Sequence, residues 1–239
     1  MAYVDGWRGR IGLITPAPGS STEAEFNQYR PEGVAVLTTR IPLKEISAEG
    51  LLKMTSYVEE AAVLLADAEA DVIVFSCTAG TLLKGPGYDR EIIERLQGLT
   101  GVKVTTTSTG VLEALKALGV KKVAVATPYS AEVNEAEKAF LEGCGFQVTS
   151  IMGPLLSDPR QVPQIAPAEM YRLARKVDTD DAEALFISCT GLHVLSIIEK
   201  LERDLGKPVI TSNQVTLWIV LKVLGVNEVI GGLGKLFTL

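Results

Sequence analysis

Two cysteines are the residues whose type and spacing could do chemistry. Cys77 and Cys189 stand in identical Ser-Cys-Thr tripeptides, 189 − 77 = 112 positions apart. A thiol has a reference pKa of about 8.5, close enough to neutrality for acid, base or nucleophile work. Two thiols on opposite faces of one carbon could remove and return a proton. Alternatively, one could add to a double bond while the other handles the proton. The pair therefore predicts a racemase or an isomerase.

The spacing of the cysteines is part of an internal repeat. The run ending at Pro16 is echoed by the run ending at Pro128, and 128 − 16 = 112 is the same offset. A third echo relates 104–119 to 209–225, with an offset of 225 − 119 = 106. Because two motifs share one offset, we infer a duplicated unit of about 110 residues, which is a plausible domain size.

Short β-branched runs alternate with helical patterns and must position the two thiols. Strands are predicted at 10–15, 34–38, 71–76, 102–106, 122–127 and 184–188. One helix is predicted between the second and third strands, with Ser47 as its N-cap, from the spacing of Leu51, Met54, Val58, Ala61, Ala62 and Leu65. This alternation indicates the α/β class.

We predict two pseudo-symmetric Rossmann-like lobes, each with a mostly parallel sheet flanked by helices, and an active site in the cleft between them. The first lobe spans 1–109 and is completed by 214–239, and the second spans 110–213. Ligands of open parallel sheets bind beyond the carboxyl ends of the strands, where both cysteines fall. A helix that starts directly after each strand is expected to lower the thiol pKa.

The candidate substrate-binding residues lie at the same strand ends. They are Pro16, Thr78, Ala79, Tyr129, Thr190 and Gly191. Hydroxyls and backbone N–H groups there could hold a carboxylate and stabilise the enediolate formed from it. Tyr129 could donate its phenol to such a carboxylate, although a packed tyrosine fits the sequence equally well.

Other reactive side chains carry less weight. A single cysteine at a strand end is usually a core residue, and only the matched pair favours function. Cys144 has no counterpart in the other half and is interpreted as packing. His193, four residues after Cys189, could tune that thiol, but a packing or surface role is favoured. The loop 155–167 holds three prolines, and long ordered loops are often functional.

Composition excludes several classes of function. A net charge of −6 argues against a nucleic-acid partner. Residues 1–8 show no secretory signal, and no apolar run approaches the roughly 18 residues of a membrane span. Three cysteines without short pairing indicate reduced thiols in a cytoplasmic protein. With one histidine, no dinucleotide fingerprint and no P-loop, we expect neither metal nor cofactor. The expected partner is a small carboxylate, and a homo-oligomer is possible.

The chain resembles the aspartate/glutamate racemase superfamily, and within it the branch of maleate cis-trans isomerase and arylmalonate decarboxylase. The segments that carry the resemblance cover nearly the whole chain: 11–16, 46–51, 76–78, 84–87, 123–129, 187–191 and 234–237. The two cysteine motifs are specific for the superfamily and less so for one reaction.

The resemblance implies a mechanism. In maleate isomerase the cysteine matching Cys77 adds to the double bond, the enediolate rotates, and elimination gives fumarate. The cysteine matching Cys189 handles the proton, and a tyrosine matching Tyr129 binds a carboxylate. In the decarboxylase a glycine replaces the first cysteine, so Cys77 argues against simple decarboxylation. In the racemases both cysteines exchange the α-proton.

The chain departs from maleate isomerase at two asparagines that grip the substrate. Its first loop reads Pro-Ala-Pro-Gly-Ser over 16–20, and the second position falls near Asp158 and Pro159. Isomerisation of maleate to fumarate is the leading prediction for the reaction. An amino-acid or hydroxy-acid racemase or epimerase, or an arylmalonate-type decarboxylase, is the alternative. A noncatalytic two-lobe small-molecule-binding protein is the alternative of another class.

Overall fold

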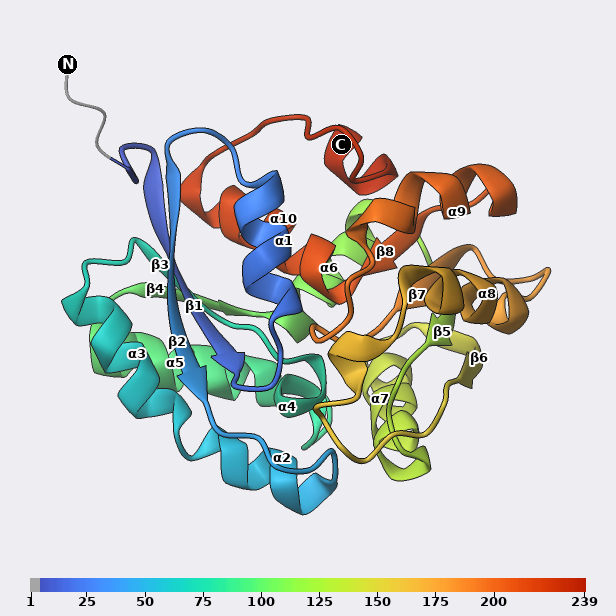
Figure 1. Cartoon of the computed structure of the whole chain (residues 1–239), viewed down its shortest axis with the longest axis horizontal. Coiled ribbons are helices and arrows are strands. Elements are labelled where there is room, and N and C mark those ends of the chain that lie inside the picture. Colours follow the sequence, from blue (N-terminus) through green and yellow to red (C-terminus); the bar gives the residue numbers. More distant parts are fainter. Residues whose placement is uncertain (1–4) are drawn as a thin grey trace.

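Two four-stranded sheets with the same strand order form the frame of the protein (Figure 1). The computed structural model describes residues 5–239, so residues 1–4 of the segment analysed for a secretory signal lie outside it. The first sheet has the order β2-β1-β3-β4 and the second β6-β5-β7-β8, with parallel pairing throughout the described ladders. The strands are β1 (Gly9–Pro16), β2 (Val34–Ile41), β3 (Val72–Phe75), β4 (Lys103–Thr106), β5 (Lys122–Ala126), β6 (Gln147–Met152), β7 (Ala184–Ile187) and β8 (Val209–Thr211). This arrangement confirms the predicted fold class.

Helices follow the strands as crossover connections. They are α1 (Ser21–Tyr29), α2 (Ala48–Thr55), α3 (Val58–Asp67), α4 (Thr78–Leu82), α5 (Tyr88–Thr100), α6 (Thr107–Ala117), α7 (Ala131–Gly143), α8 (Pro167–Val177), α9 (Ile198–Leu205) and α10 (Ser212–Leu224), with short 3₁₀ turns η1 (Val162–Gln164), η2 (Leu195–Ile197) and η3 (Lys235–Thr238). No helix of residues 5–239 is long and apolar enough to cross a bilayer.

The prediction of a single helix after the second strand is wrong, because the structure has two helices there, α2 and α3. Ser47 caps α2 as predicted, accepting a hydrogen bond from the Gly50 N–H at 3.1 Å. The break falls between α2 and α3, where the hydroxyls of Thr55 and Ser56 bond back to carbonyls of the preceding turn. Such side-chain bonds compete with the helical ladder. The six apolar residues of the predicted helix are all buried.

The central strands are buried on both faces, as parallel strands between two layers of helices must be. In β7 the side chain of Phe186 lies in one apolar cluster, and its neighbours Leu185 and Ile187 lie in the other. In β5, Val123 and Ala124 divide in the same way. Because successive side chains of a strand point to opposite faces, each apolar run packs against helices on both sides of its sheet.

Helix α10 joins the two halves. It follows β8 of the second sheet but packs against α6 and against β3 and β4 of the first sheet. Gly110 of α6 permits this approach, because a Cβ there would lie 2.9 Å from the Val215 carbonyl oxygen. The hydroxyls of Thr107 and Thr216 hydrogen-bond across the same contact at 2.9 Å. The exact lobe boundaries stay a prediction.

Candidate active site

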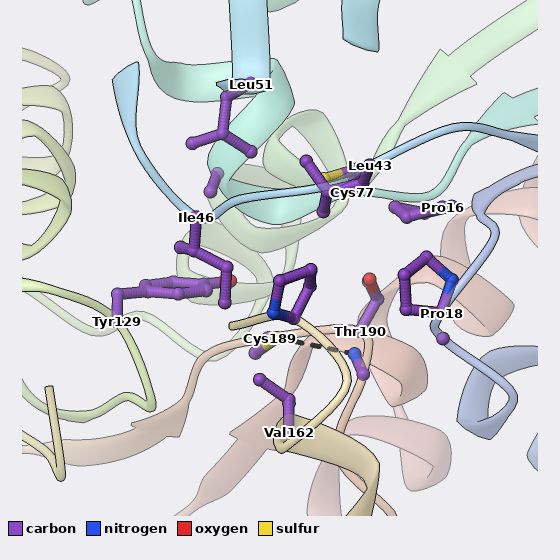
Figure 2. A pocket seen from close by; sticks show the side chains of 14 residues that line it. Pro16, Pro18, Leu43, Ile46, Leu51, Cys77, Tyr129, Val162, Cys189 and Thr190 are labelled. Atoms are coloured by element: carbon purple, nitrogen blue, oxygen red, sulfur yellow. Dashed lines mark hydrogen bonds between the residues drawn. The ribbon is translucent and has the colours of Figure 1, made fainter. Parts of the chain in front are cut away.

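One cavity receives side chains from the strand ends of both halves (Figure 2). It has an empty volume of about 450 Å³, measured out to its mouth. Its fourteen lining residues are Pro16, Pro18, Gly19, Leu43, Ile46, Leu51, Cys77, Ala79, Tyr129, Pro159, Val162, Cys189, Thr190 and Gly191. Seven of the eight residues singled out from the sequence are among them. The exception is Thr78.

Cys77 has an ordinary backbone. It follows β3 in extended conformation, with φ −157°, and is the N-cap of the five-residue helix α4. The residue is 6% exposed. A Cβ at Gly80 would lie 2.7 Å from the Met54 Cε atom and 3.1 Å from the Cys77 Sγ atom. Glycine at this position therefore leaves room for the thiol.

Cys189 has an unusual backbone. Its φ of +124° lies in a region that non-glycine residues rarely adopt, and such strain persists only where surrounding contacts impose it. One such contact is the hydrogen bond from the Cys189 N–H to the Ser212 Oγ atom at 2.9 Å. No helix begins at Cys189. The chain turns through 190–194 before η2 and then α9.

Both thiols are neutral in this cavity at neutral pH. Burial raises the pKa of Cys77 to about 12 and that of Cys189 to about 11. The Gly80 N–H lowers the pKa of Cys77, and the Tyr129 hydroxyl and the Gly191 N–H lower that of Cys189, but these effects do not offset burial. The expected lowering of the thiol pKa values is therefore wrong, because desolvation by burial outweighs every group that favours the thiolate.

Tyr129 lies in the cavity with its hydroxyl turned toward the second thiol. The residue follows Pro128 at the end of β5 and is 3% exposed. Its hydroxyl lowers the pKa of the Cys189 thiol, opposing the effect of burial. Burial raises the pKa of Tyr129 well above its usual range, so the phenol keeps its proton and remains a donor. The Gly191 N–H donates a hydrogen bond to the Cys189 Sγ atom at 3.4 Å (Figure 2).

The two Ser-Cys-Thr motifs are hydrogen-bonded to each other. The Thr190 hydroxyl donates to the Ser76 carbonyl oxygen at 3.3 Å. The Thr78 Oγ atom lies 2.8 Å from the Ser212 Oγ atom, which also accepts the Cys189 N–H. Thr78 thus joins the motifs behind the cavity instead of lining it. These bonds set the distance between the halves at the point where both thiols emerge.

Seven lining residues were not predicted from the sequence, and most of them are apolar. Leu43 and Ile46 lie on the loop after β2, whereas Pro159 and Val162 belong to the proline-rich segment that the sequence marked as functional. The two loops meet where the Ile46 N–H donates to the Ser157 carbonyl oxygen at 2.8 Å. No site residue was predicted on the loop after β2. Its role depends on contact with a segment more than a hundred residues away.

The lining has few polar side chains. Within residues 5–239 it contains no lysine, arginine, histidine, asparagine or glutamine. A bound anion would depend on backbone N–H groups and on the hydroxyl of Tyr129, because the Thr190 hydroxyl already donates to the Ser76 carbonyl oxygen. His193 is half-buried and does not line the cavity, and Cys144 caps the end of α7 away from it. Both positions agree with packing roles.

Comparisons with known proteins cover the whole site. The family model for arylmalonate decarboxylase matches residues 11–237. Maleate isomerase of Pseudomonas putida is 27% identical over 96% of this chain and 97% of its own length. A crystal structure of a cysteine-to-alanine variant of maleate isomerase from Pseudomonas putida, with maleate, has a TM-score of 0.93 at 26% identity and covers 96% of this chain and 97% of that chain.

A second solved structure bears on the thiol chemistry of that enzyme. It is a cysteine-to-serine variant of Nocardia farcinica maleate cis-trans isomerase with a covalently bound succinylcysteine intermediate. Its TM-score is 0.91 at 26% identity, and the match covers 96% of this chain and 98% of that chain. The predicted resemblance is confirmed: the chain belongs to the arylmalonate decarboxylase family, whose relatives include these maleate isomerases.

Proposed function

We propose that this protein is a cofactor-independent isomerase that converts maleate to fumarate. The observation that carries the proposal is the delivery of Cys77 and Cys189 into one cavity from equivalent strand ends of two duplicated halves. The full-length similarity to maleate isomerases supports the same reaction. One thiol acts as nucleophile and the other as acid and base, so the reaction needs only these two side chains and an anion site.

The first step is addition. The step starts from the minor fraction of enzyme in which Cys77 has already lost its proton to solvent. The Cys77 thiolate attacks one olefinic carbon, a C–S bond forms, and the π pair moves toward the neighbouring carbon and its carboxylate. Cys189 donates its proton to that neighbouring carbon and becomes a thiolate. The product is a succinyl thioether whose central carbon–carbon bond is single and free to rotate. This is the same kind of adduct as the one present in the Nocardia farcinica structure.

The second step is elimination. After rotation the Cys189 thiolate takes the proton back, the pair re-forms the double bond, and Cys77 leaves as a thiolate. The trans product is fumarate. Because Cys189 ends as a thiol and Cys77 as a thiolate, both residues return to their starting states. The Tyr129 hydroxyl and the N–H groups near Thr190 and Gly191 hold the carboxylate on which negative charge develops.

A second candidate is favoured by the apolar lining. Leu43, Ile46, Leu51 and Val162 surround the thiols, and they suit an apolar α-substituent better than a second carboxylate. With such a substrate the two cysteines would exchange an α-proton and racemise the acid. This reaction uses the same thiols and no adduct.

One pair of measurements separates the two candidates. The enzyme is incubated with maleate, and fumarate is followed by proton NMR. In parallel it is incubated in D₂O with 2-phenylpropionate, an acid with an apolar α-substituent, and loss of the α-proton signal is followed. Fumarate formation supports the isomerase. If the enzyme exchanges the α-proton of 2-phenylpropionate and forms no fumarate, the racemase assignment replaces the isomerase assignment.

The binding partner and the cellular location are also part of the proposal. We expect a small carboxylate as the partner. The three cysteines are free thiols, in keeping with a reducing, cytoplasmic location.

A further inference from the structure

Glu25 of α1 is a buried carboxylate that the proposed reaction does not use. It is 5% exposed, and one of its oxygens accepts the N–H groups of Val194 at 2.8 Å and Leu195 at 2.9 Å. The other oxygen accepts the Asn213 Nδ2 atom at 2.6 Å. The carboxylate therefore has three donors, all from the second half of the chain, although α1 follows the first strand of the first half.

Two neighbours extend this contact to the residues that follow the second thiol. The Asn213 Nδ2 atom also lies 3.1 Å from the Thr190 carbonyl oxygen and 3.2 Å from that of Leu192. The Thr22 hydroxyl contacts the Thr190 carbonyl oxygen at 3.0 Å and the Asn213 Oδ1 atom at 2.9 Å. The backbone of 190–195 is thus bonded to α1 and α10 along most of its length.

This segment needs external support because it has no regular structure of its own. It directly follows Cys189, whose φ is +124°, and it reaches η2 only at Leu195. In the first half the residue after Cys77 starts α4, so that backbone is held by its own helical bonds. A turn with one strained residue relaxes unless surrounding contacts hold it.

The equivalent position of the second half does not make these bonds. Glu137 is 137 − 25 = 112 residues later, the same offset as that between the cysteines. Its carboxyl accepts the Ser188 hydroxyl at 2.6 Å. Among the described hydrogen bonds it accepts no backbone N–H from the segment after Cys77. The contact of Glu25 with 194–195 is therefore a feature of one half and not of the repeat.

We propose that Glu25 is a positioning residue that, with Asn213 and Thr22, holds the 190–195 segment so that Cys189 faces the cavity. The inference deepens the proposed function because it concerns the same site. Removing the carboxylate would leave Cys77 in place and free the segment that carries the acid–base thiol. Turnover should fall, and the reactivity of one cysteine alone should change.

The test uses the full chain and three variants. Glu25→Gln keeps the size of the side chain, but its NH₂ group must face at least one of three N–H donors. Thr22→Val removes only the hydroxyl contacts. Glu32→Gln removes one exposed carboxylate outside the network and is the matched control. Maleate turnover is measured together with the iodoacetamide alkylation rate of each cysteine by peptide mapping, with Cys144 as internal reference.

We expect Glu25→Gln to lower kcat/KM for maleate by about tenfold or more, since unsatisfied buried donors disturb the segment. Alkylation of Cys189 relative to Cys144 should rise about threefold or more, whereas the ratio for Cys77 stays unchanged. Thr22→Val should shift the same two quantities in the same direction by about two- to threefold. Glu32→Gln should match the wild type in both.

Three outcomes would overturn the inference. The first is wild-type turnover and alkylation in Glu25→Gln. The second is an equal rise at Cys77 and Cys189, which would indicate general loosening. The third outcome applies if the Glu25→Gln protein does not fold. In that case an alkylation rate of Cys189 in Thr22→Val equal to that of the wild type contradicts the proposal. If the wild type does not turn over maleate, the proposed function fails, whereas the alkylation pattern still tests the role of Glu25.

Discussion

The two cysteines occupy equivalent positions of a duplicated unit, yet the structure holds them by different means. Cys77 has a regular extended backbone and a helix directly after it, so local bonds set its position. Cys189 has a positive φ and an irregular segment after it, held by Ser212 and by residues of α1. The difference teaches that duplication can supply a pair of like groups, while later divergence of the surrounding contacts gives each group its own role.

The largest expected effect distinguishes the roles of the two thiols. Cys77→Ala and Cys189→Ala should each lower kcat for maleate by about a thousandfold or more, because nucleophile and proton donor are both essential. In Cys189→Ser, incubation with maleate should leave a stable adduct on Cys77, seen by intact-protein mass spectrometry. Cys77→Ser should form none. An adduct on Cys189 in the Cys77→Ser protein would reverse the assignment.

Tyr129→Phe tests the role of the Tyr129 hydroxyl in the proposed anion site. The substitution removes the hydroxyl that lowers the pKa of Cys189 and would hold a carboxylate, and it leaves the buried ring in place. We expect kcat/KM to fall about 10- to 100-fold, the range for a lost hydrogen bond to a charged group. Steady-state assays with maleate measure it. A change of less than about twofold would remove Tyr129 from the anion site.

The pH dependence follows from the burial of both thiols. Because the pKa of Cys77 is raised to about 12, its thiolate is a minor species at neutral pH and increases about tenfold per pH unit. We therefore expect log kcat/KM to rise between pH 7 and 9 with a slope near 1. Cys77 alkylation by iodoacetamide should rise in parallel. A plateau below pH 8 would show that the nucleophile ionises much more easily than its burial implies.

The smallest expected effect concerns Glu137, the carboxyl that occupies the position equivalent to Glu25 in the second half. Burial raises the pKa of Glu137 to about 8, and the Ser188 bond only partly opposes this rise. An unfolded glutamate ionises near pH 4.3, so the unfolded state holds fewer protons and stability falls as pH rises toward 8. Glu137→Gln keeps an acceptor for Ser188 and cannot ionise. Its Tm should match the wild type at pH 5 and exceed it by several degrees at pH 8. An equal difference at both values would rule out titration of Glu137 as the cause.

Much of this protein could be predicted because its signals are local or repeated. The α/β class with parallel sheets follows from strand–helix alternation, and the cysteine pair follows from one offset shared by two motifs. Ser47 caps α2 as its sequence position indicates. The break between α2 and α3 escaped prediction because apolar spacing continues through it. Thr78 was placed in the cavity, whereas its hydroxyl points to Ser212, a contact that depends on how the halves meet.

The amino-acid sequence by itself determined the fold class, the duplication and the two thiols at matching strand ends, because periodicity and offset are properties of the chain. Only the tertiary structure decided the ionisation of those thiols, the strain at Cys189 and the apolar lining. The physical reason is that desolvation and backbone strain depend on every group packed around an atom. Those groups come from loops and helices that lie far away along the chain.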